Sequence, residues 1–272
     1  MLADLHLHTT ESDGTWRPEQ LVHEAVKVGL SAIAITDHDT TAGIEAALRS
    51  APSNLEVIPG IELSSNAESG EEVHIVGLWI DPCDEALQTK LAVLREERME
   101  RVDKMLDRLR ALGIVLEYDD VRKYAHKDVL SRSHVASALV EKGIVESKQE
   151  AFDRYIGYGK PAYVGRPKLS PRESVELVLN AGGVPVLAHP GLLEDLSLLP
   201  ALVDAGLVGL EVIHHSHSPR QTEDFMQMAE HLGLLPSGGS DCHGPGGKEQ
   251  VYIGRYTIPW HWLQALGTKR RQ

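Results

Sequence analysis

The stretch HLHTTESDGT, residues 6–15, closes the first apolar run of the chain, Leu2–Leu7. This run is typical of a short buried β-strand. His6 and His8 are two positions apart, so an extended backbone directs both imidazoles to the same face. Asp13 follows in a polar loop. A strand that ends in His-x-His and continues into an acidic loop predicts that metal-competent side chains gather where this strand ends.

Short apolar, β-branched runs alternate with amphipathic helical patterns over most of the remaining chain. This alternation predicts an α/β fold, a parallel sheet or barrel with helices on its outside. Two helix starts carry a capping serine followed by proline, at Ser170-Pro171 and Ser218-Pro219. The predicted strands after the first are Ala32–Thr36, Glu56–Ile61, Val73–Ile80, Val184–Ala188, Gly209–Ile213 and Leu235–Gly238.

Residues 84–167 interrupt this rhythm, because several helical patterns follow one another there without an intervening strand. The first of them is long and carries apolar residues at steps of three or four. We therefore predict two units. Residues 1–83 and 168–272 form the barrel, and residues 84–167 form a helical insertion, a cap subdomain over the mouth of the barrel.

Metal-competent residues stand at the ends of most predicted strands, where the active sites of β/α-barrel enzymes lie. Without a cation, so many ionisable groups in one pocket would carry a heavy cost of desolvation and repulsion. Imidazole and carboxylate donors suit zinc, manganese or iron. Six histidines and three carboxylates exceed the needs of one ion, so two or three ions are expected. The candidate ligands are His6, His8, Asp13, His38, Glu62, His74, His189, Asp241 and His243.

The composition restricts the classes of function. The chain has 272 residues, 42% of them hydrophobic and 25% charged, with a mean hydropathy of −0.20. A formal net charge of −13 argues against a broad basic surface for long nucleic acid, but leaves room for a small phosphorylated substrate. Two cysteines, Cys83 and Cys242, are too few for a disulfide framework. With no signal-peptide pattern and no bilayer-spanning run, we expect a soluble cytoplasmic protein, without membrane contact and with no protein partner indicated.

The chain resembles the polymerase and histidinol phosphatase (PHP) superfamily in six ordered motifs that span residues 6–243: HLHTTESDGT, ITDHDT, GIELS, VHIVG, LAHPG and SDCHG. The resemblance implies a distorted seven-stranded barrel, (β/α)7, with a trinuclear metal site. It assigns the role of metal ligand to the nine candidate positions, each of which holds a metal-competent residue. It also implies three divalent transition metals, with manganese first and iron, zinc or magnesium as alternatives.

A multinuclear centre predicts hydrolysis of a phosphoester by a metal-activated hydroxide, without a protein nucleophile. Glu62 and Asp13 are the candidates to bridge the ions. Asp37, next to His38, has two interpretations of equal weight. It orients a ligand imidazole from the outer coordination sphere, or it is a turn aspartate at a strand end.

The insertion holds the candidate substrate residues. The sequence SRSH, residues 131–134, stands immediately before a helical pattern, and a helix N-terminus with an arginine and a histidine is a natural phosphate site. Arg98 occupies an apolar-phase position of the first insertion helix, where leucine is expected, and Arg101 lies one turn away. The predicted substrate-binding residues are therefore Arg132, His134, Arg98, Arg101 and Ser133.

Three more histidines, His214, His215 and His217, follow the sixth predicted strand and precede the helix that starts at Ser218. We interpret them as surface or capping residues, with His217 as the one candidate to face the site.

Within the superfamily, a helical insertion with this motif resembles the branch that dephosphorylates nucleotides. The leading hypothesis is a metal-dependent phosphatase for small nucleotides that removes the 3′-phosphate of a nucleoside 3′,5′-bisphosphate and also accepts AMP. The enzymatic alternatives are a 5′→3′ exoribonuclease for short RNA and a histidinol-phosphate phosphatase. The alternative from another class is a non-catalytic PHP module with a structural role, and the complete ligand set argues against it.

Overall fold

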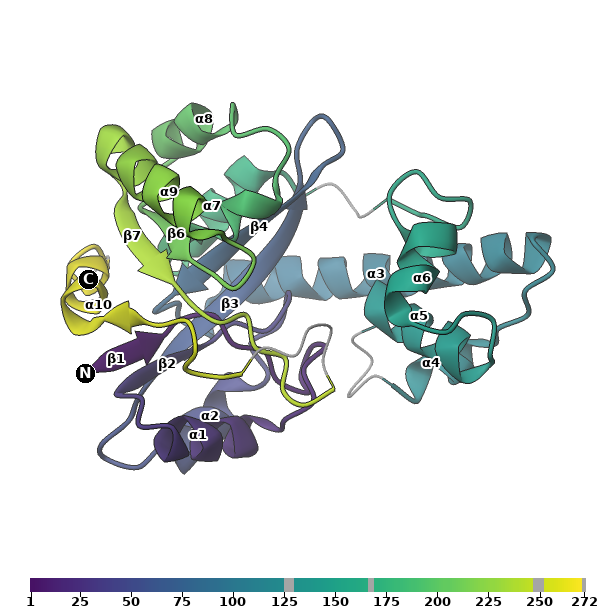
Figure 1. Cartoon of the computed structure of the whole chain (residues 1–272), viewed down its shortest axis with the longest axis horizontal. Coiled ribbons are helices and arrows are strands. Elements are labelled where there is room, and N and C mark those ends of the chain that lie inside the picture. Colours follow the sequence, from purple (N-terminus) through teal and green to yellow (C-terminus); the bar gives the residue numbers. More distant parts are fainter. Residues whose placement is uncertain (125–129, 166–168, 247–251, 271–272) are drawn as a thin grey trace.

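The chain forms a curved sheet surrounded by helices, and a second group of helices extends from it to one side (Figure 1). This computed structural model describes residues 1–124, 130–165, 169–246 and 252–270, and the side chain of Arg98 lies outside the described part. The architecture confirms the predicted α/β barrel with a helical insertion. Within these ranges, no helix combines the length and the apolar character needed to cross a membrane.

In the described part of the chain, eight strands form one sheet in the order β7-β6-β5-β4-β3-β2-β1-β8. The segments that follow β1 and β7 also meet, because Leu5 N–H donates to Gly238 O (3.3 Å) and Leu7 forms a β-bridge with Cys242. The sheet is therefore a nearly closed barrel. Its strands are β1 (Leu2–Asp4), β2 (Ala32–Ile35), β3 (Glu56–Asn66), β4 (Glu72–Leu78), β5 (Val184–Leu187), β6 (Gly209–Ile213), β7 (Leu235–Gly238) and β8 (Ile258–Pro259).

β4 runs antiparallel to both of its neighbours, β3 and β5, whereas the alternation of elements predicted parallel strands. The reason is the short connection between β3 and β4, which spans only residues 67–71, whereas a parallel crossover needs about a dozen residues or more. The start of β4 consequently lies beside the end of β3, and His74 pairs with Ser64. His74 therefore reaches the same rim as the residues that follow the parallel strands.

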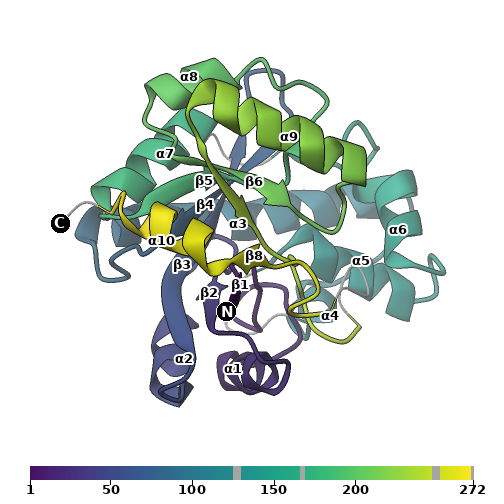
Figure 2. The same cartoon turned by 60° about the vertical axis from the view of Figure 1, so that its left-hand side comes forward.

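Helices surround the outside of the barrel (Figure 2). Successive residues of β2 point to opposite faces of the sheet. Ile33 and Ile35 pack against the outer helices, whereas Ala32 and Ala34 belong to a second hydrophobic cluster on the other face. The predicted capping serines are confirmed at the starts of α7 and α9. The barrel helices are α1 (Pro18–Lys27), α2 (Ile44–Ser50), α7 (Pro171–Asn180), η2 (Pro190–Leu192), α8 (Leu199–Asp204), α9 (Pro219–Leu232) and α10 (Trp260–Gly267).

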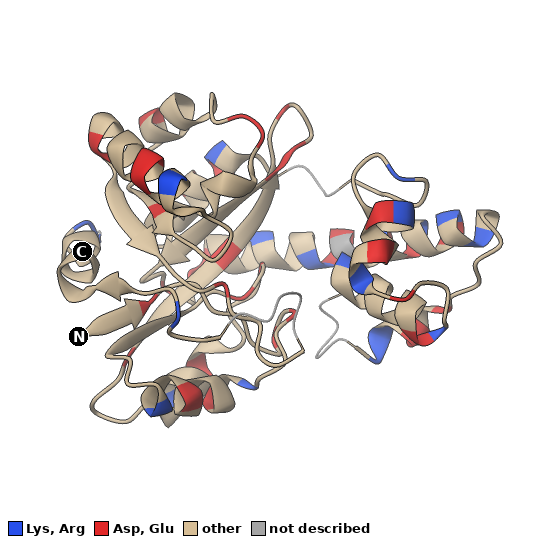
Figure 3. Cartoon of the chain, in the orientation of Figure 1, with Lys and Arg blue, Asp and Glu red and all other residues tan. Residues whose placement is uncertain are grey.

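A long helix, α3 (Glu85–Ala111), connects the barrel to the second group of helices. Its first turns place Leu87, Leu91 and Leu94 in the barrel core, whereas its later turns belong to a separate core of the helical group. Basic and acidic residues are interspersed along this helix (Figure 3). The other elements of the group are α4 (Tyr118–Arg122), α5 (Arg132–Glu141), α6 (Lys148–Ala151) and the π-helix η1 (Phe152–Ile156).

Candidate metal centre

The nine predicted ligands lie together at one rim of the barrel, although they come from six segments of the chain. The topology explains this convergence, because the ends of β1, β2, β5 and β7, the second half of β3 and the start of β4 face the same rim. Two isolated β-bridges, Leu7 with Cys242 and His38 with Glu62, hold the segments beyond the strands in register. The cluster is thus built on backbone that the sheet positions.

Glu62 occupies the centre of the cluster, with a side chain that is 1% exposed. Burial alone would raise the pKa of Glu62, but the imidazoles of His38, His74 and His6 lower it well below its usual value. The group is therefore an ionised carboxylate that faces five rings. Its Oε1 lies 2.8 Å from His74 Nδ1, 3.1 Å from His189 Nε2 and 3.3 Å from His6 Nε2, and its Oε2 lies 2.8 Å from His38 Nδ1 and 3.4 Å from His8 Nε2.

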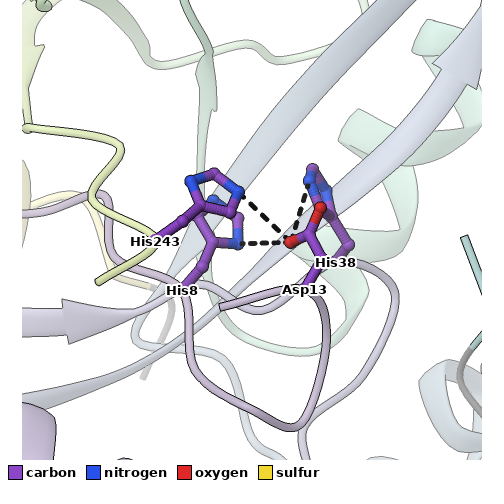
Figure 4. A group of neighbouring side chains, drawn as sticks. All are labelled: His8, Asp13, His38 and His243. Atoms are coloured by element: carbon purple, nitrogen blue, oxygen red, sulfur yellow. Dashed lines mark ion pairs between the residues drawn. The ribbon is translucent and has the colours of Figure 1, made fainter. Parts of the chain in front are cut away.

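Asp13 and Asp241 add two further negative charges to the cluster. Figure 4 shows Asp13 Oδ1 between three imidazoles, at 3.2 Å from His243 Nε2, 3.8 Å from His38 Nε2 and 4.0 Å from His8 Nδ1. Asp241 Oδ1 lies 2.9 Å from His8 Nε2. Burial would raise the pKa of each aspartate, yet the surrounding histidines hold both pKa values well below the usual range. Both side chains are therefore anionic donors.

Several buried nitrogens and oxygens of the cluster have no hydrogen-bond partner among the described residues, although opposite atoms lie close. His38 Nδ1 and Glu62 Oε2, for example, are 2.8 Å apart without hydrogen-bond geometry. Buried polar atoms rarely stay unpaired, so cations placed among them would satisfy them together. The atoms are His6 Nε2, both ring nitrogens of His8, Asp13 Oδ1, His38 Nδ1, Glu62 Oε2 and His189 Nδ1.

The predicted ligands contain three sets of donor atoms that are compact enough to hold an ion, since the atoms of each set lie within 4.8 Å of one another. The donors are nitrogen and oxygen, which suits manganese, iron, zinc or magnesium. Cys242 remains a thiol, because burial raises its pKa to about 11. The sets are His8, Asp13, His38 and His243; His6, His8 and Asp241; and His38, Glu62 and His74.

Manganese binding should strengthen as the pH rises from 6.5 to 8.5. Burial lowers the pKa of His74 and His243, but the carboxylates of Glu62 and Asp13 outweigh it and raise each pKa to about 9. A cation must displace these protons, so its affinity increases where they are lost more easily. Competition with a chelator at several pH values measures the effect. An affinity that does not change with pH would show that these rings carry no proton in the metal-free chain.

Asp39 (φ 51°), His189 (φ 27°) and Asp241 (φ 53°), which lie at the rim, have left-handed backbone conformations that residues other than glycine rarely adopt. Each costs of the order of 1–3 kcal/mol and persists only where the surroundings impose it. Here backbone hydrogen bonds impose it, since Asp39 N–H donates to Glu62 O at 3.0 Å and Asp241 N–H donates to His6 O at 2.9 Å. The strain is therefore concentrated at the donor cluster.

Asp37 supports the loop that carries Asp13. Its Oδ1 accepts hydrogen bonds from Thr9 N–H (2.7 Å) and Ser12 Oγ–H (2.5 Å), and its Oδ2 accepts one from Thr9 Oγ1–H (2.6 Å). These bonds use both carboxylate oxygens. Asp37 thus fixes the loop after β1 and, through it, the position of Asp13.

Arg132 is the substrate candidate that a chain of side-chain contacts connects to the donor cluster. It begins α5, its guanidinium binds the Glu72 carboxylate, and the other oxygen of that carboxylate lies 2.9 Å from His74 Nε2. The guanidinium also lies 5.6 Å from the ring centres of Phe152 and Tyr163. Arg132 is therefore held beside the metal-competent residues by one carboxylate and two rings.

The other substrate candidates have local structural contacts. His134 Nδ1 accepts from Ser131 N–H at 3.1 Å in a capping box, and Ser133 is buried in the first turn of the same helix. Arg101 is 6% exposed and its Nε donates to Val164 O at 2.8 Å, so it ties α3 to the segment after η1. The side chain of Arg98 lies outside the described residues.

The end of β6 adds two buried groups that were not among the predicted ligands. Glu211 is 3% exposed and accepts a hydrogen bond from His6 Nδ1 at 3.0 Å. The interpretation of His214 as a surface or capping residue is wrong, since it is 1% exposed and its Nε2 lies 3.5 Å from Asp241 Oδ2. An isolated glutamate inside the apolar pattern Gly209–Ile213 was the available signal in the sequence.

His217 also turns inward, but both of its ring nitrogens are bound by the backbone. Its Nε2 accepts from Gly191 N–H at 3.1 Å, and its Nδ1–H donates to Val212 O at 3.0 Å. This histidine holds the turn after His189 in place.

Comparison with known proteins agrees with this geometry. The PHP domain matches residues 4–134. The chain is 37% identical over 250 residues to the 3′,5′-nucleoside bisphosphate phosphatase of Chromobacterium violaceum, in an alignment that covers 89% of this chain and 87% of the relative. It is 35% identical over 287 residues to the 5′-3′ exoribonuclease Rnm of Escherichia coli (strain K12), in an alignment that covers 100% of this chain and 97% of the relative.

A solved structure from Bifidobacterium adolescentis, described as a proposed metal-dependent phosphoesterase, superposes with a TM-score of 0.89 at 31% identity. The superposition covers 99% of this chain and 96% of that one. The fold and these relatives define a metal-dependent hydrolase of phosphate esters. The chain belongs to the PHP domain family, as the six ordered motifs predicted.

Proposed function

We propose that this enzyme hydrolyses phosphate monoesters of small nucleotides, and that it removes the 3′-phosphate of a nucleoside 3′,5′-bisphosphate. The observation that carries the proposal is the position of Arg132, a cation at the start of α5 that Glu72 holds next to His74. An arginine there provides charge for one phosphate while the other lies at the donor cluster. The phosphatase of Chromobacterium violaceum, 37% identical, supports this choice of substrate.

In this proposal the nine clustered residues hold three divalent cations, with manganese as the metal we expect. When bound, the cations supply the Lewis acidity that activates water and neutralises the phosphoryl oxygens. Glu62 would contribute to holding these cations through both of its oxygens, which face different histidines. The buried setting keeps these donors in place before substrate arrives, which lowers the cost of reorganisation during the reaction.

A phosphate-release screen in the presence of manganese tests the proposal. Its substrates are nucleoside monophosphates, nucleoside 3′,5′-bisphosphates, histidinol phosphate and short 5′-phosphorylated RNA. We expect the bisphosphates to have the highest kcat/KM and to yield the nucleoside 5′-monophosphate. Turnover of histidinol phosphate alone would overturn the nucleotide assignment.

The second candidate is 5′→3′ exonucleolytic hydrolysis of short RNA, for which the full-length similarity to the Escherichia coli exoribonuclease is the supporting observation. Length analysis of the labelled RNA from the same reactions separates the two, because an exonuclease shortens the oligonucleotide one nucleotide at a time. A phosphatase leaves its length unchanged.

Replacing Arg132 with alanine should raise KM for a nucleoside bisphosphate about 10- to 100-fold, with a smaller change in kcat. The reason is the loss of a charged hydrogen bond to phosphate, which contributes about 1.5–3 kcal/mol. Steady-state kinetics with the lysine variant as a partial rescue measures the effect. Arg154→Ala is the matched control, because Arg154 is an exposed arginine of η1 that pairs with Glu150. Equal changes in both alanine variants would contradict the role given to Arg132.

A further inference from the structure

We propose that Glu211 and His214, at the end of β6, are positioning residues that orient three of the metal ligands, and that His214 is not itself a ligand. The inference rests on the proposed metal centre. β6 carries none of the nine predicted ligands, yet it ends beside them. The side chains of Glu211 in β6 and of His214 directly after it contact His6, His189 and Asp241, which come from the segments after β1, β5 and β7.

Glu211 connects two ligands through its two oxygens. Its Oε1 accepts a hydrogen bond from the imidazole of His6 at 3.0 Å, and its Oε2 accepts one from the backbone N–H of His189 at 2.6 Å. The second bond stabilises His189 in its left-handed conformation, with φ 27°. A single carboxylate thus fixes the ring of one ligand and the strained backbone of another.

The bond from His6 also determines which ring nitrogen is free. Because Nδ1 of His6 carries the proton that it donates to Glu211, the lone pair of the neutral ring is on Nε2. That nitrogen faces Glu62 Oε1 at 3.3 Å and Asp241 Oδ1 at 3.5 Å, inside the donor cluster. Glu211 therefore selects the tautomer that a cation needs.

The hydrogen bonds of His214 define the opposite arrangement. Its Nδ1 lies 2.8 Å from Ser216 Oγ, a hydroxyl that can donate or accept, and 3.2 Å from the backbone N–H of Ser216, which can only donate. Nδ1 therefore accepts, and in the neutral ring the proton is on Nε2. This Nε2 is buried, has no closer hydrogen-bond partner among the described residues, and faces Asp241 Oδ2 at 3.5 Å. A protonated nitrogen donates to a carboxylate and offers no lone pair to a cation. His214 therefore orients Asp241, whose other oxygen faces His6 and His8.

The competing interpretation is an additional metal site. Two compact donor sets include His214, one with His6 and Glu211 and one with His215 and Asp241. In the first set, His6 and Glu211 already share a hydrogen bond, and in the second set the Ser216 N–H directs the proton of His214 toward Asp241. These bonds favour the positioning role over ligation.

The experiment compares four variants with the wild-type chain: Glu211→Gln, His214→Ala, His214→Gln and His231→Ala. Manganese per chain at saturation is measured by elemental analysis, and manganese affinity is measured by chelator competition. In His214→Gln, the NH2 group of the amide can donate to Asp241. In Glu211→Gln, the NH2 group replaces one of the two accepting oxygens, so it cannot accept the hydrogen bond from His6 or from His189. His231→Ala removes an exposed histidine of α9 and is the control.

We expect His214→Ala and Glu211→Gln to keep the wild-type number of bound metals and to lose about 10- to 100-fold in affinity. His214→Gln should recover most of the affinity, and His231→Ala should not change it. One metal fewer in both His214 variants would overturn the inference in favour of ligation. Unchanged affinity in all variants would overturn it as well, while leaving the metal centre intact. A wild-type chain that binds no manganese would overturn both the inference and the metal centre.

Discussion

Replacing Glu62 with glutamine should reduce kcat for phosphate release about 10³-fold or more, which is the largest catalytic loss we expect from one substitution. Glu62 is the carboxylate that faces five imidazoles, and glutamine keeps its size while it removes the charge. Each loss of about 1.4 kcal/mol of transition-state stabilisation slows a reaction tenfold. The expected factor therefore corresponds to the loss of several kcal/mol of stabilisation of the transition state by the metals. Metal content of the purified variant should fall in parallel.

Glu56→Gln provides a matched control for this experiment. Glu56 begins the same strand, β3, but its side chain is exposed at the opposite end from the donor cluster. The same chemical change there should leave kcat and metal content unchanged. If the Glu62 variant kept wild-type turnover and metal content, the centre of the proposed site would be misplaced.

The positions of the nine candidate ligands could be predicted because strand geometry is local. Two residues that are two positions apart in an extended segment share a face, which relates His6 to His8 after the end of β1, and the ends of parallel strands share a rim. His74 is the exception in this logic. It lies at the start of a strand, and only the antiparallel direction of β4 brings it to the rim.

The residues that were missed or placed differently depend on contacts between distant segments. Glu211 and His214 acquire a role only because β6 lies next to β5 and close to the end of β1. Arg101 was predicted from helix phase, but the partner that its Nε binds, Val164 O, is 63 positions away. Periodicity shows which face of an element is buried. It gives no information about which polar partner that face will meet.

The link between the helical group and the cluster has the same nonlocal origin. The motif SRSH indicated a phosphate site from its place before a helix, and α5 does begin at Arg132. The contact with Glu72 could not be inferred, because it depends on how α5 approaches β4. Through the carboxylate of Glu72, this contact connects Arg132, a substrate candidate, to the predicted ligand His74.

Removal of the metals should lower the melting temperature of the chain by about 10 °C or more. Ligands that bind only the folded state stabilise it by about 2.7 kcal/mol per site at 100 times the dissociation constant, and several sites add. For a chain of this size, each kcal/mol corresponds to about 2–4 °C. In the metal-free chain, Glu62 Oε2 and several ring nitrogens, such as His38 Nδ1 and His6 Nε2, stay buried without a hydrogen-bond partner among the described residues, which is costly. Thermal unfolding with EDTA, and again after manganese is restored, measures the difference.

The His8→Ala variant distinguishes metal linkage from a general effect of the chelator. His8 belongs to two of the compact donor sets, so its loss should remove most of the manganese-dependent gain in melting temperature. The melting temperature of the metal-free variant should stay near that of the metal-free wild type, or exceed it, because one buried polar ring has been removed. An equal manganese-dependent gain in both chains would mean that manganese stabilises the fold from another place. The unfolding measurements would then no longer support manganese binding at the donor cluster.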